Sequence, residues 1–193
     1  MTKAKTGRPR SEKAREAVLA ATRELLSENE GGALSIEAIA RRGKVGKPTI
    51  YRWWPSIADI VLEAMLHEAD ESIPVPGAAP LADSLRCFLR DSMQSLNDGA
   101  GVHLRFLMAH AQKDTEFRDR FRGKFVSKRR AVLRSVFEQA DTEERSLDAG
   151  KLDLLVDVVF GAMWYRLLTG HGPLDEKFAD ELAELAAGFY GRG

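Results

Sequence analysis

The chain has 193 residues with 29 basic and 29 acidic side chains, so its net charge is zero, and its single cysteine, Cys87, excludes an internal disulfide. Ala, Leu, Glu and Arg are abundant, and β-branched residues never alternate with polar ones over a strand's length, so we expect little or no sheet. The most apolar region, 154–165, is interrupted by Asp157 and falls short of the ~20 residues that span a bilayer. We therefore expect an all-α, cytoplasmic protein without a membrane segment.

Charge is distributed unevenly along the chain. Twelve basic and six acidic residues stand at or before Ser56, whereas 17 basic and 23 acidic residues follow it. A basic head on an acidic body indicates that only the head meets a polyanion.

The first elements are a polar arm and one helix. Residues 1–10 are basic and contain Gly7 and Pro9, which predicts a flexible arm. Ser11 is a suitable N-cap for a helix that ends at Gly31-Gly32. Its apolar positions follow helical spacing: Ala14, Ala17, Val18, Ala21 and Leu25.

Two short helices are predicted next. Ser35 opens the first, which runs through about Arg42 and is broken by residues 43–46. Pro48 suits the first turn of the second, where its missing N–H is not needed. Pro55 forces Trp54 toward an extended conformation and ends that helix within two turns.

A fourth helix completes the head. Ser56 and Asp59 have the spacing of a capping box, and the helix that they open runs to about Glu71. Three prolines and a glycine follow in 72–80, which indicates a stiff connector. We therefore place one domain at 11–71 and a larger helical domain at 81–193.

The second domain shows alternating helical and turn patterns. We expect helices over 81–96, 102–112, 114–139, 152–168 and 175–190, with a turn at 97–101 and a loop at 141–150. The weakest helical pattern lies near Gly123.

A long helix followed by two short helices, preceded by basic residues, is the minimal arrangement of a helix-turn-helix DNA reader. Val45, Ile50 and Trp54 can face the inside of such a unit. The outer side and tip of the third helix then carry Lys47, Pro48, Thr49, Tyr51, Arg52 and Trp53. Lys can bond guanine acceptors, Pro and the Thr methyl can touch thymine methyls, and Tyr, Thr and Arg can donate to phosphates.

At residues 34–40 and 45–56 the sequence resembles the TetR family of tetracycline-repressor-like regulators. Residues 165–174 also look like a segment common in one subset of that family. The resemblance implies base-facing roles for Lys47, Pro48, Thr49 and Tyr51, and DNA-backbone roles for Ser35, Tyr51 and Trp53.

The sequence departs from the family pattern at two positions. Lys44 stands where the turn usually has Gly, so either Lys44 or a neighbouring glycine must take the left-handed conformation. Ile57 stands where a Lys is usual, which removes one expected phosphate contact, and Arg52 or Arg42 can substitute for it.

Other basic residues allow two interpretations. Arg8 and Arg10 fit a minor-groove arm, and they equally fit an ordinary basic terminus. Arg41 and Arg42 can contact phosphates, although cations at a helix C-terminus are favourable without DNA.

The region 152–168 is apolar nearly all round, which is typical of a helix with two partners. We expect a symmetric four-helix dimer interface with the last helix, as the resemblance also implies. Its predicted residues are Leu152, Leu155, Val156, Val159, Met163, Phe178, Leu182, Leu185 and Phe189. A second stripe holds Leu154, Val158, Ala162 and Tyr165, and a wholly intramolecular core is the alternative.

Bulky or polar-tipped side chains are numerous for a domain of this size. Candidates for a ligand pocket are Phe88, Met93, Phe106, His110, Phe125, Phe137, Trp164 and Tyr165, although core residues look the same in sequence. His103 and His110 lack a third ligand at matching spacing, and Cys87 fits inert packing, so we expect no metal and no cofactor.

These patterns predict a sequence-specific, DNA-binding transcriptional regulator. Its expected partners are a palindromic operator in double-stranded DNA, a second copy of itself and an unknown small-molecule effector that releases it as a repressor. Two alternatives stay open: a small-molecule enzyme, for which no catalytic motif is visible, and a helical protein-interaction module with a vestigial DNA-binding head.

Overall fold

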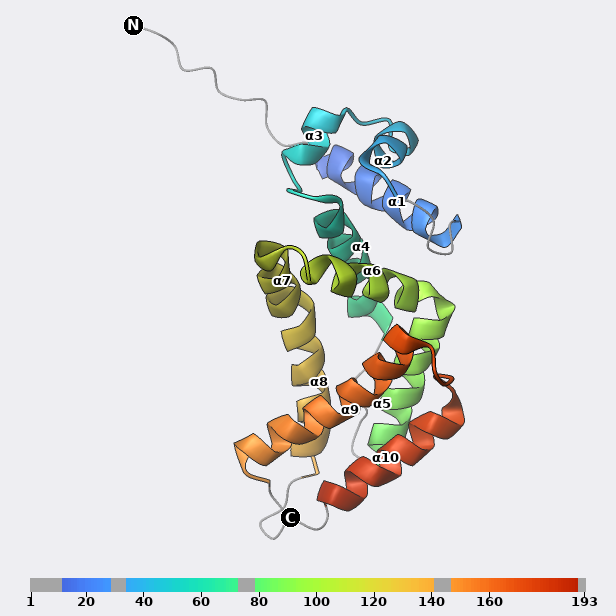
Figure 1. Cartoon of the computed structure of the whole chain (residues 1–193), viewed down its shortest axis with the longest axis vertical. Coiled ribbons are helices and arrows are strands. Elements are labelled where there is room, and N and C mark those ends of the chain that lie inside the picture. Colours follow the sequence, from blue (N-terminus) through green and yellow to red (C-terminus); the bar gives the residue numbers. More distant parts are fainter. Residues whose placement is uncertain (1–11, 29–33, 73–78, 141–146, 191–193) are drawn as a thin grey trace, which may run out of the picture. The chain divides into compact units, whose positions relative to one another are not determined.

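The computed structural model describes residues 12–28, 34–72, 79–140 and 147–190. All regular elements among these residues are helices, which confirms the expected all-α class (Figure 1). The chain divides into two compact units, Met1–Ala64 and Met65–Gly193. This division falls within a helix, earlier than the connector at 72–80, most of which lies outside the described residues.

The first unit is built on α1 (Glu12–Glu28), α2 (Ile36–Arg42), α3 (Lys47–Tyr51) and the start of α4 (Ile57–Ser72). These bounds confirm the predicted long helix followed by two short ones. Ser11 and Gly31-Gly32, the expected ends of the first helix, lie outside the described residues. One apolar core joins the four helices and contains Val18, Leu19, Leu25, Ile39, Ile50, Trp54, Ile60 and Ala64.

Side-chain caps fix where α2 and α4 begin. Ser35 accepts a hydrogen bond from the Ala38 N–H at 3.1 Å, which satisfies one of the free donors at the start of α2. Ser56 accepts from the Asp59 N–H at 3.3 Å and donates to the Asp59 carboxylate at 2.7 Å. Both caps were predicted from the sequence, and both are confirmed.

The turn between α2 and α3 combines a strained residue with a close approach. Lys44 has φ 51°, so it takes the left-handed conformation that the family usually gives to glycine. Gly43 instead allows α2 to approach α1, because a Cβ at this position would lie 3.1 Å from the carbonyl oxygen of Ala17. The turn therefore uses its glycine for packing and its lysine for the positive φ.

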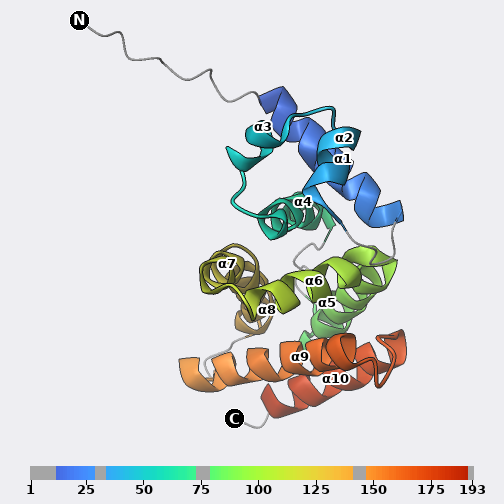
Figure 2. The same cartoon turned by 45° about the horizontal axis from the view of Figure 1, so that its top comes forward.

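The second unit contains the remaining helices (Figures 1 and 2). In chain order they are α5 (Leu81–Ser95), η1 (Leu96–Ala100), α6 (Gly101–Ala111), α7 (Thr115–Phe121), η2 (Arg122–Val126), α8 (Ser127–Glu138), α9 (Ala149–Thr169) and α10 (Glu176–Tyr190). α10 packs along α5, and α9 runs beside α10 in both views. No described helix has the length and apolar character needed to cross a membrane.

Local irregularities fall where the sequence pattern is weakest. The predicted turn at 97–101 is the π-helical turn η1, in which Gly99 has φ 124°. The predicted helix at 114–139 is divided into α7, η2 and α8, with Gly123 inside the π-helical turn η2. α9 begins earlier than predicted because Asp148 caps it by accepting from the N–H groups of Gly150 and Lys151.

Candidate nucleic-acid interface and effector region

The third helix presents one buried and one exposed side. Ile50 and Trp54 are 0% and 2% exposed, and both belong to the core of the first unit. Lys47, Pro48, Tyr51 and Arg52 are exposed, and Thr49 is partly exposed. The inward and outward positions are therefore those predicted from the sequence, except that Trp53, expected outside, packs partly against the core.

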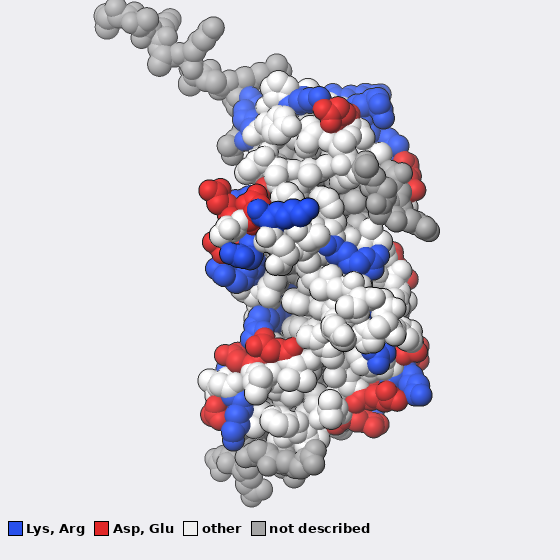
Figure 3. Space-filling model, viewed as in Figure 1, with Lys and Arg blue, Asp and Glu red and all other residues white. Residues whose placement is uncertain are grey.

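Lys47 already has a carboxylate partner on the neighbouring helix. Its Nζ donates to Oε1 of Glu37, which lies in the first turn of α2. This contact raises the pKa of Lys47 and lowers the pKa of Glu37. Figure 3 shows Lys and Arg atoms with acidic atoms among them over α2 and α3. Sequence reasoning missed the role of Glu37, although its place beside the recognition helix follows from the trihelical arrangement.

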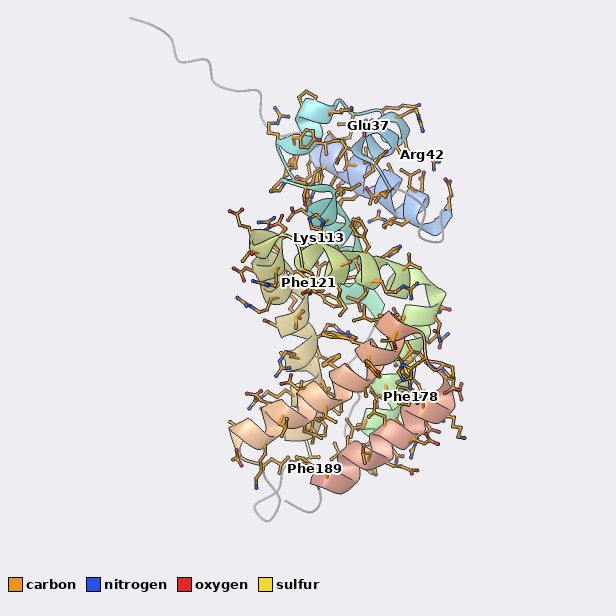
Figure 4. All side chains as sticks on the ribbon, viewed as in Figure 1. Glu37, Arg42, Lys113, Phe121, Phe178 and Phe189 are labelled. Carbon is orange, nitrogen blue, oxygen red and sulfur yellow. The ribbon has the colours of Figure 1, made fainter. Side chains whose placement is uncertain are left out.

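Arg42 is held by α1. Its guanidinium pairs with Glu24 at 3.1 Å and with Glu28 at 2.7 Å, and these carboxylates raise the pKa of Arg42. Figure 4 shows Glu37 and Arg42 at opposite ends of α2. These ion pairs favour a structural role for Arg42 over the phosphate contact predicted for it.

Two adjacent tryptophans follow α3 and differ in environment. Trp54 donates its indole N–H to Oε2 of Glu63 at 2.8 Å, which supplies the partner that a buried indole needs. Trp53 is partly buried against the same core, and the Arg15 guanidinium lies 5.6 Å from its ring centre. Arg15 also pairs with Glu63. Trp53 is thus less available to DNA than Tyr51, which is 56% exposed.

The predicted arm contacts, Arg8 and Arg10, lie outside the described residues.

The predicted dimer residues divide into two groups. Six of them are at most 4% exposed within the single chain: Leu152, Leu155, Val156, Val159, Met163 and Leu182. They pack inside their own unit and leave almost no surface for a partner, so the burial of this stripe does not support their assignment to an interface. Leu185 and Phe189 are exposed, whereas Phe178 is partly buried under the Arg166 guanidinium, 3.4 Å from its ring centre.

The opposite stripe of α9 is the exposed one. The large apolar side chains exposed on α9 and α10 are Leu154, Val158, Tyr165, Leu168, Leu185 and Phe189, and Tyr51 is the other such residue recorded in the described part of the chain. The four on α9 follow helical spacing, so they share one face of that helix. Figure 4 places Phe178 and Phe189 toward opposite ends of α10.

The candidate pocket residues do not form one cluster. Phe106 and His110 continue through Phe117 and Phe121 to Phe125, with successive ring centres 5.0 to 6.3 Å apart. Phe88 and Trp164 instead belong with Phe160, which contacts both rings.

Other members of the predicted pocket lie elsewhere. Phe137 stacks on Tyr190 at 5.7 Å, and Met93 is buried. Tyr165 is 63% exposed beside His171, apart from the other candidates, and its place in a pocket stays a prediction.

Arg129 and His103 of the second unit are also partly buried. Arg129, which sequence reasoning missed, reaches Ser92 and the face of Phe88. Burial lowers the pKa of His103.

Among the described residues, no three His, Cys, Asp or Glu side chains are grouped so that they could hold a metal ion. Cys87 is exposed, with its thiol 3.6 Å from the Asp91 carboxylate.

Comparison with known proteins covers both units. Residues 18–64 match the family described as "Bacterial regulatory proteins, tetR family", and residues 75–186 match "Tetracyclin repressor-like, C-terminal domain". The HTH-type transcriptional regulator YdeS of Bacillus subtilis is 26% identical over 178 residues, which cover 92% of this chain and 90% of YdeS.

Solved structures agree with this relationship. The TetR-family transcription regulator SCO0332 is 27% identical, with a TM-score of 0.75, covering 91% of this chain and 97% of SCO0332. FadR from Bacillus subtilis, solved in complex with stearoyl-CoA, shares the fold at 15% identity and a TM-score of 0.66, covering 89% of this chain and 97% of FadR. With both of its units matched, the chain belongs to the TetR family of DNA-binding transcriptional regulators.

Proposed function

We propose that the protein is a homodimeric repressor that binds a palindromic operator and leaves it when a small-molecule effector binds the second unit. The observation that carries the proposal is the orientation of α3. Its buried side, Ile50 and Trp54, anchors the helix, while its exposed residues have the donors and methyl groups that DNA reading needs.

Lys47, Pro48, Thr49 and Tyr51 are the proposed base-facing residues. Arg52, which is exposed at the C-cap of α3, is the proposed phosphate contact in place of Arg42. Ser35 keeps its hydroxyl on the start of α2 and contributes to DNA binding by positioning this helix. The arm, with Arg8 and Arg10, remains a predicted minor-groove contact.

The dimer uses the exposed stripes of α9 and α10. Six large apolar side chains are exposed on these two neighbouring helices, and exposed apolar patches mark interaction sites. A two-fold axis beside them would bury both stripes against their copies in a four-helix arrangement. Such a dimer presents two copies of α3 to half-sites separated by about one turn of DNA, or by a whole number of turns.

The effector region lies within the second unit. FadR, which shares the fold, is solved in complex with stearoyl-CoA, so at least one protein with this fold binds a small molecule. Trp164, which is partly exposed and packs on the buried Phe160 ring, supplies apolar contact surface here. An effector that binds the DNA-incompetent form more tightly shifts the population away from the operator.

Selection of bound sequences from random duplex DNA tests the proposal directly. We expect a palindrome, with binding that weakens steeply as salt rises. The matched control is Tyr51→Ala, which removes an exposed α3 side chain and should reduce enrichment without unfolding the protein. Recovery of no common sequence, or of a non-palindromic one, would contradict dimeric operator binding.

A further inference from the structure

Arg129 on α8 contacts a hydroxyl group and an aromatic ring, and no carboxylate of a described residue pairs with it. Its Nη2 donates to Oγ of Ser92 on α5 at 3.0 Å, and the guanidinium carbon lies 5.3 Å from the centre of the Phe88 ring. Ser92 and Phe88 are buried, and Arg129 itself is partly buried. The positive charge therefore sits between a hydroxyl group and an aromatic face.

Other arginines of this unit pair with a carboxylate or donate to a backbone carbonyl. Arg90 pairs with Asp180 at 2.6 Å, Arg134 pairs with Asp153 at 2.6 Å, and Arg166 donates to the Pro173 carbonyl at 2.8 Å. No carboxylate of a described residue is within ion-pair distance of Arg129. Burial accordingly lowers the pKa of Arg129, whereas carboxylates raise the pKa of Arg90 and Arg134.

A buried cation that lacks a counter-ion is costly, so such a group marks a place where a partner is expected. The guanidinium has five N–H donors, and one of them donates to Oγ of Ser92. The Ser92 hydroxyl hydrogen is a further donor at the same place. The pair is thus rich in donors and lacks an anionic acceptor.

Aromatic rings extend away from this donor pair. The centre of the Phe160 ring on α9 lies 6.4 Å from that of Phe88 and 5.2 Å from that of Trp164. Trp164, like Arg129, keeps part of its surface exposed. Three helices, α5, α8 and α9, therefore bring together one cation, one hydroxyl and three aromatic rings.

We propose that Arg129, held in place by Ser92, binds the carboxylate of a small, largely apolar organic acid, whose apolar part contacts the exposed side of Trp164. The planar guanidinium matches a carboxylate with two parallel hydrogen bonds. One cation balances a single negative charge, which favours a monocarboxylate over a phosphate group. The inference rests on the proposed function only in making this acid the effector.

The ligand-free protein provides the first test. Replacing an unpaired, partly buried cation with an apolar side chain of similar length relieves its desolvation cost, so Arg129→Met should unfold at the same temperature as the wild type or higher. Lys128→Met, which removes an exposed charge from the preceding position, is the matched control. A clear loss of stability in Arg129→Met alone would make Arg129 a structural residue and overturn the proposal.

Binding is tested with octanoate and 4-phenylbutyrate as probes, and with octanamide and 4-phenylbutanamide as uncharged controls. Thermal unfolding and tryptophan fluorescence should detect the acids and not the amides. Arg129→Met should weaken acid binding by at least about tenfold, because a charge-assisted hydrogen bond is lost. Ser92→Ala should weaken it less, and Lys128→Met should leave it unchanged.

The inference would be overturned if the acids and the amides bound equally well. It would also be overturned if the acids bound wild type and Arg129→Met equally well, or if none of the four probes bound. Operator binding separates this result from the proposed function. Acids that bind through Arg129 without releasing DNA would retain the site and remove its effector role. An uncharged effector that releases wild type and Arg129→Met alike would retain the proposed function and remove the carboxylate site.

Discussion

Lys47 of α3 donates to Glu37 of α2, so the first basic residue of the recognition helix is already neutralised in the DNA-free protein. DNA phosphates and base acceptors must compete with this carboxylate for the Lys47 ammonium. Glu37 is exposed, and its own charge also opposes a phosphate backbone brought to the same surface. The ion pair is therefore expected to limit operator affinity.

Glu37→Gln should raise operator affinity several-fold by removing this competition, and Lys47→Ala should lower it roughly tenfold to a hundredfold with a shallower salt dependence. Fluorescence anisotropy over a salt series measures both effects. Asp119→Asn and Lys124→Ala remove the same charges from the second unit and serve as controls. Weaker binding by Glu37→Gln would mean that the carboxylate positions Lys47 for DNA instead of competing for it.

Trp54 and Tyr51 should separate stability from DNA binding. Trp54 is 2% exposed, so Trp54→Ala should cost ~3 to 5 kcal/mol of unfolding free energy through the cavity that it leaves and the Glu63 contact that it loses. Tyr51→Ala, at a 56% exposed position, should leave stability nearly unchanged and weaken operator binding. Chemical unfolding and operator titration of both variants check this. The reverse pattern would mean that α3 is turned the other way.

Lys44 offers a gain in stability. A non-glycine residue in the left-handed region is strained, so Lys44→Gly should raise the unfolding free energy by about 0.5 to 1 kcal/mol after the greater backbone entropy of glycine is counted. Lys44→Ala removes the same side chain but keeps the strain, so it should show no such gain. Urea unfolding of the three proteins measures the difference, and equal midpoints for all three would show that this turn is unstrained.

His103 should make the second unit sensitive to acid. Burial lowers its pKa, so the folded state resists protonation while the unfolded chain takes up a proton near pH 6.5. Stability therefore falls as pH decreases through about 6.5 and levels off below the folded-state pKa, with a slope of at most about 1.4 kcal/mol per pH unit. Urea unfolding of wild type and His103→Gln between pH 8 and pH 5 tests this. Parallel pH profiles would remove His103 as the cause.

The sequence was sufficient for the first unit because local rules and tertiary packing agree there. Ser35 and Ser56 occupy cap positions, prolines limit α3, and helical spacing then places Ile50 and Trp54 inside. Lys44 could be named as one of two sources of the positive φ, but choosing it required knowing that Gly43 lies against α1.

The second unit exposed the limit of pattern reasoning. α9 is apolar nearly all round, so helical periodicity identifies two stripes and cannot decide which one the subunit buries. Arg129 presents the same difficulty, because it stands between Lys128 and Arg130 and only packing against α5 distinguishes it from them. Both outcomes depend on which neighbouring helix meets which face, and that information is not local.

Adjacent valines on α9 now test the proposed interface. Val158 is 45% exposed on the outer stripe, whereas Val159 is 0% exposed within the subunit. Val158→Glu should give a helical monomer at micromolar concentration, since it places a charge in the proposed dimer contact without disturbing the interior. Val159→Glu should instead unfold the second unit, because its carboxylate has no partner in an apolar core and burying it costs several kcal/mol. Sedimentation velocity and circular dichroism distinguish these results. A monomeric wild type, or a Val158→Glu protein that remains dimeric, would rule out this stripe as the interface.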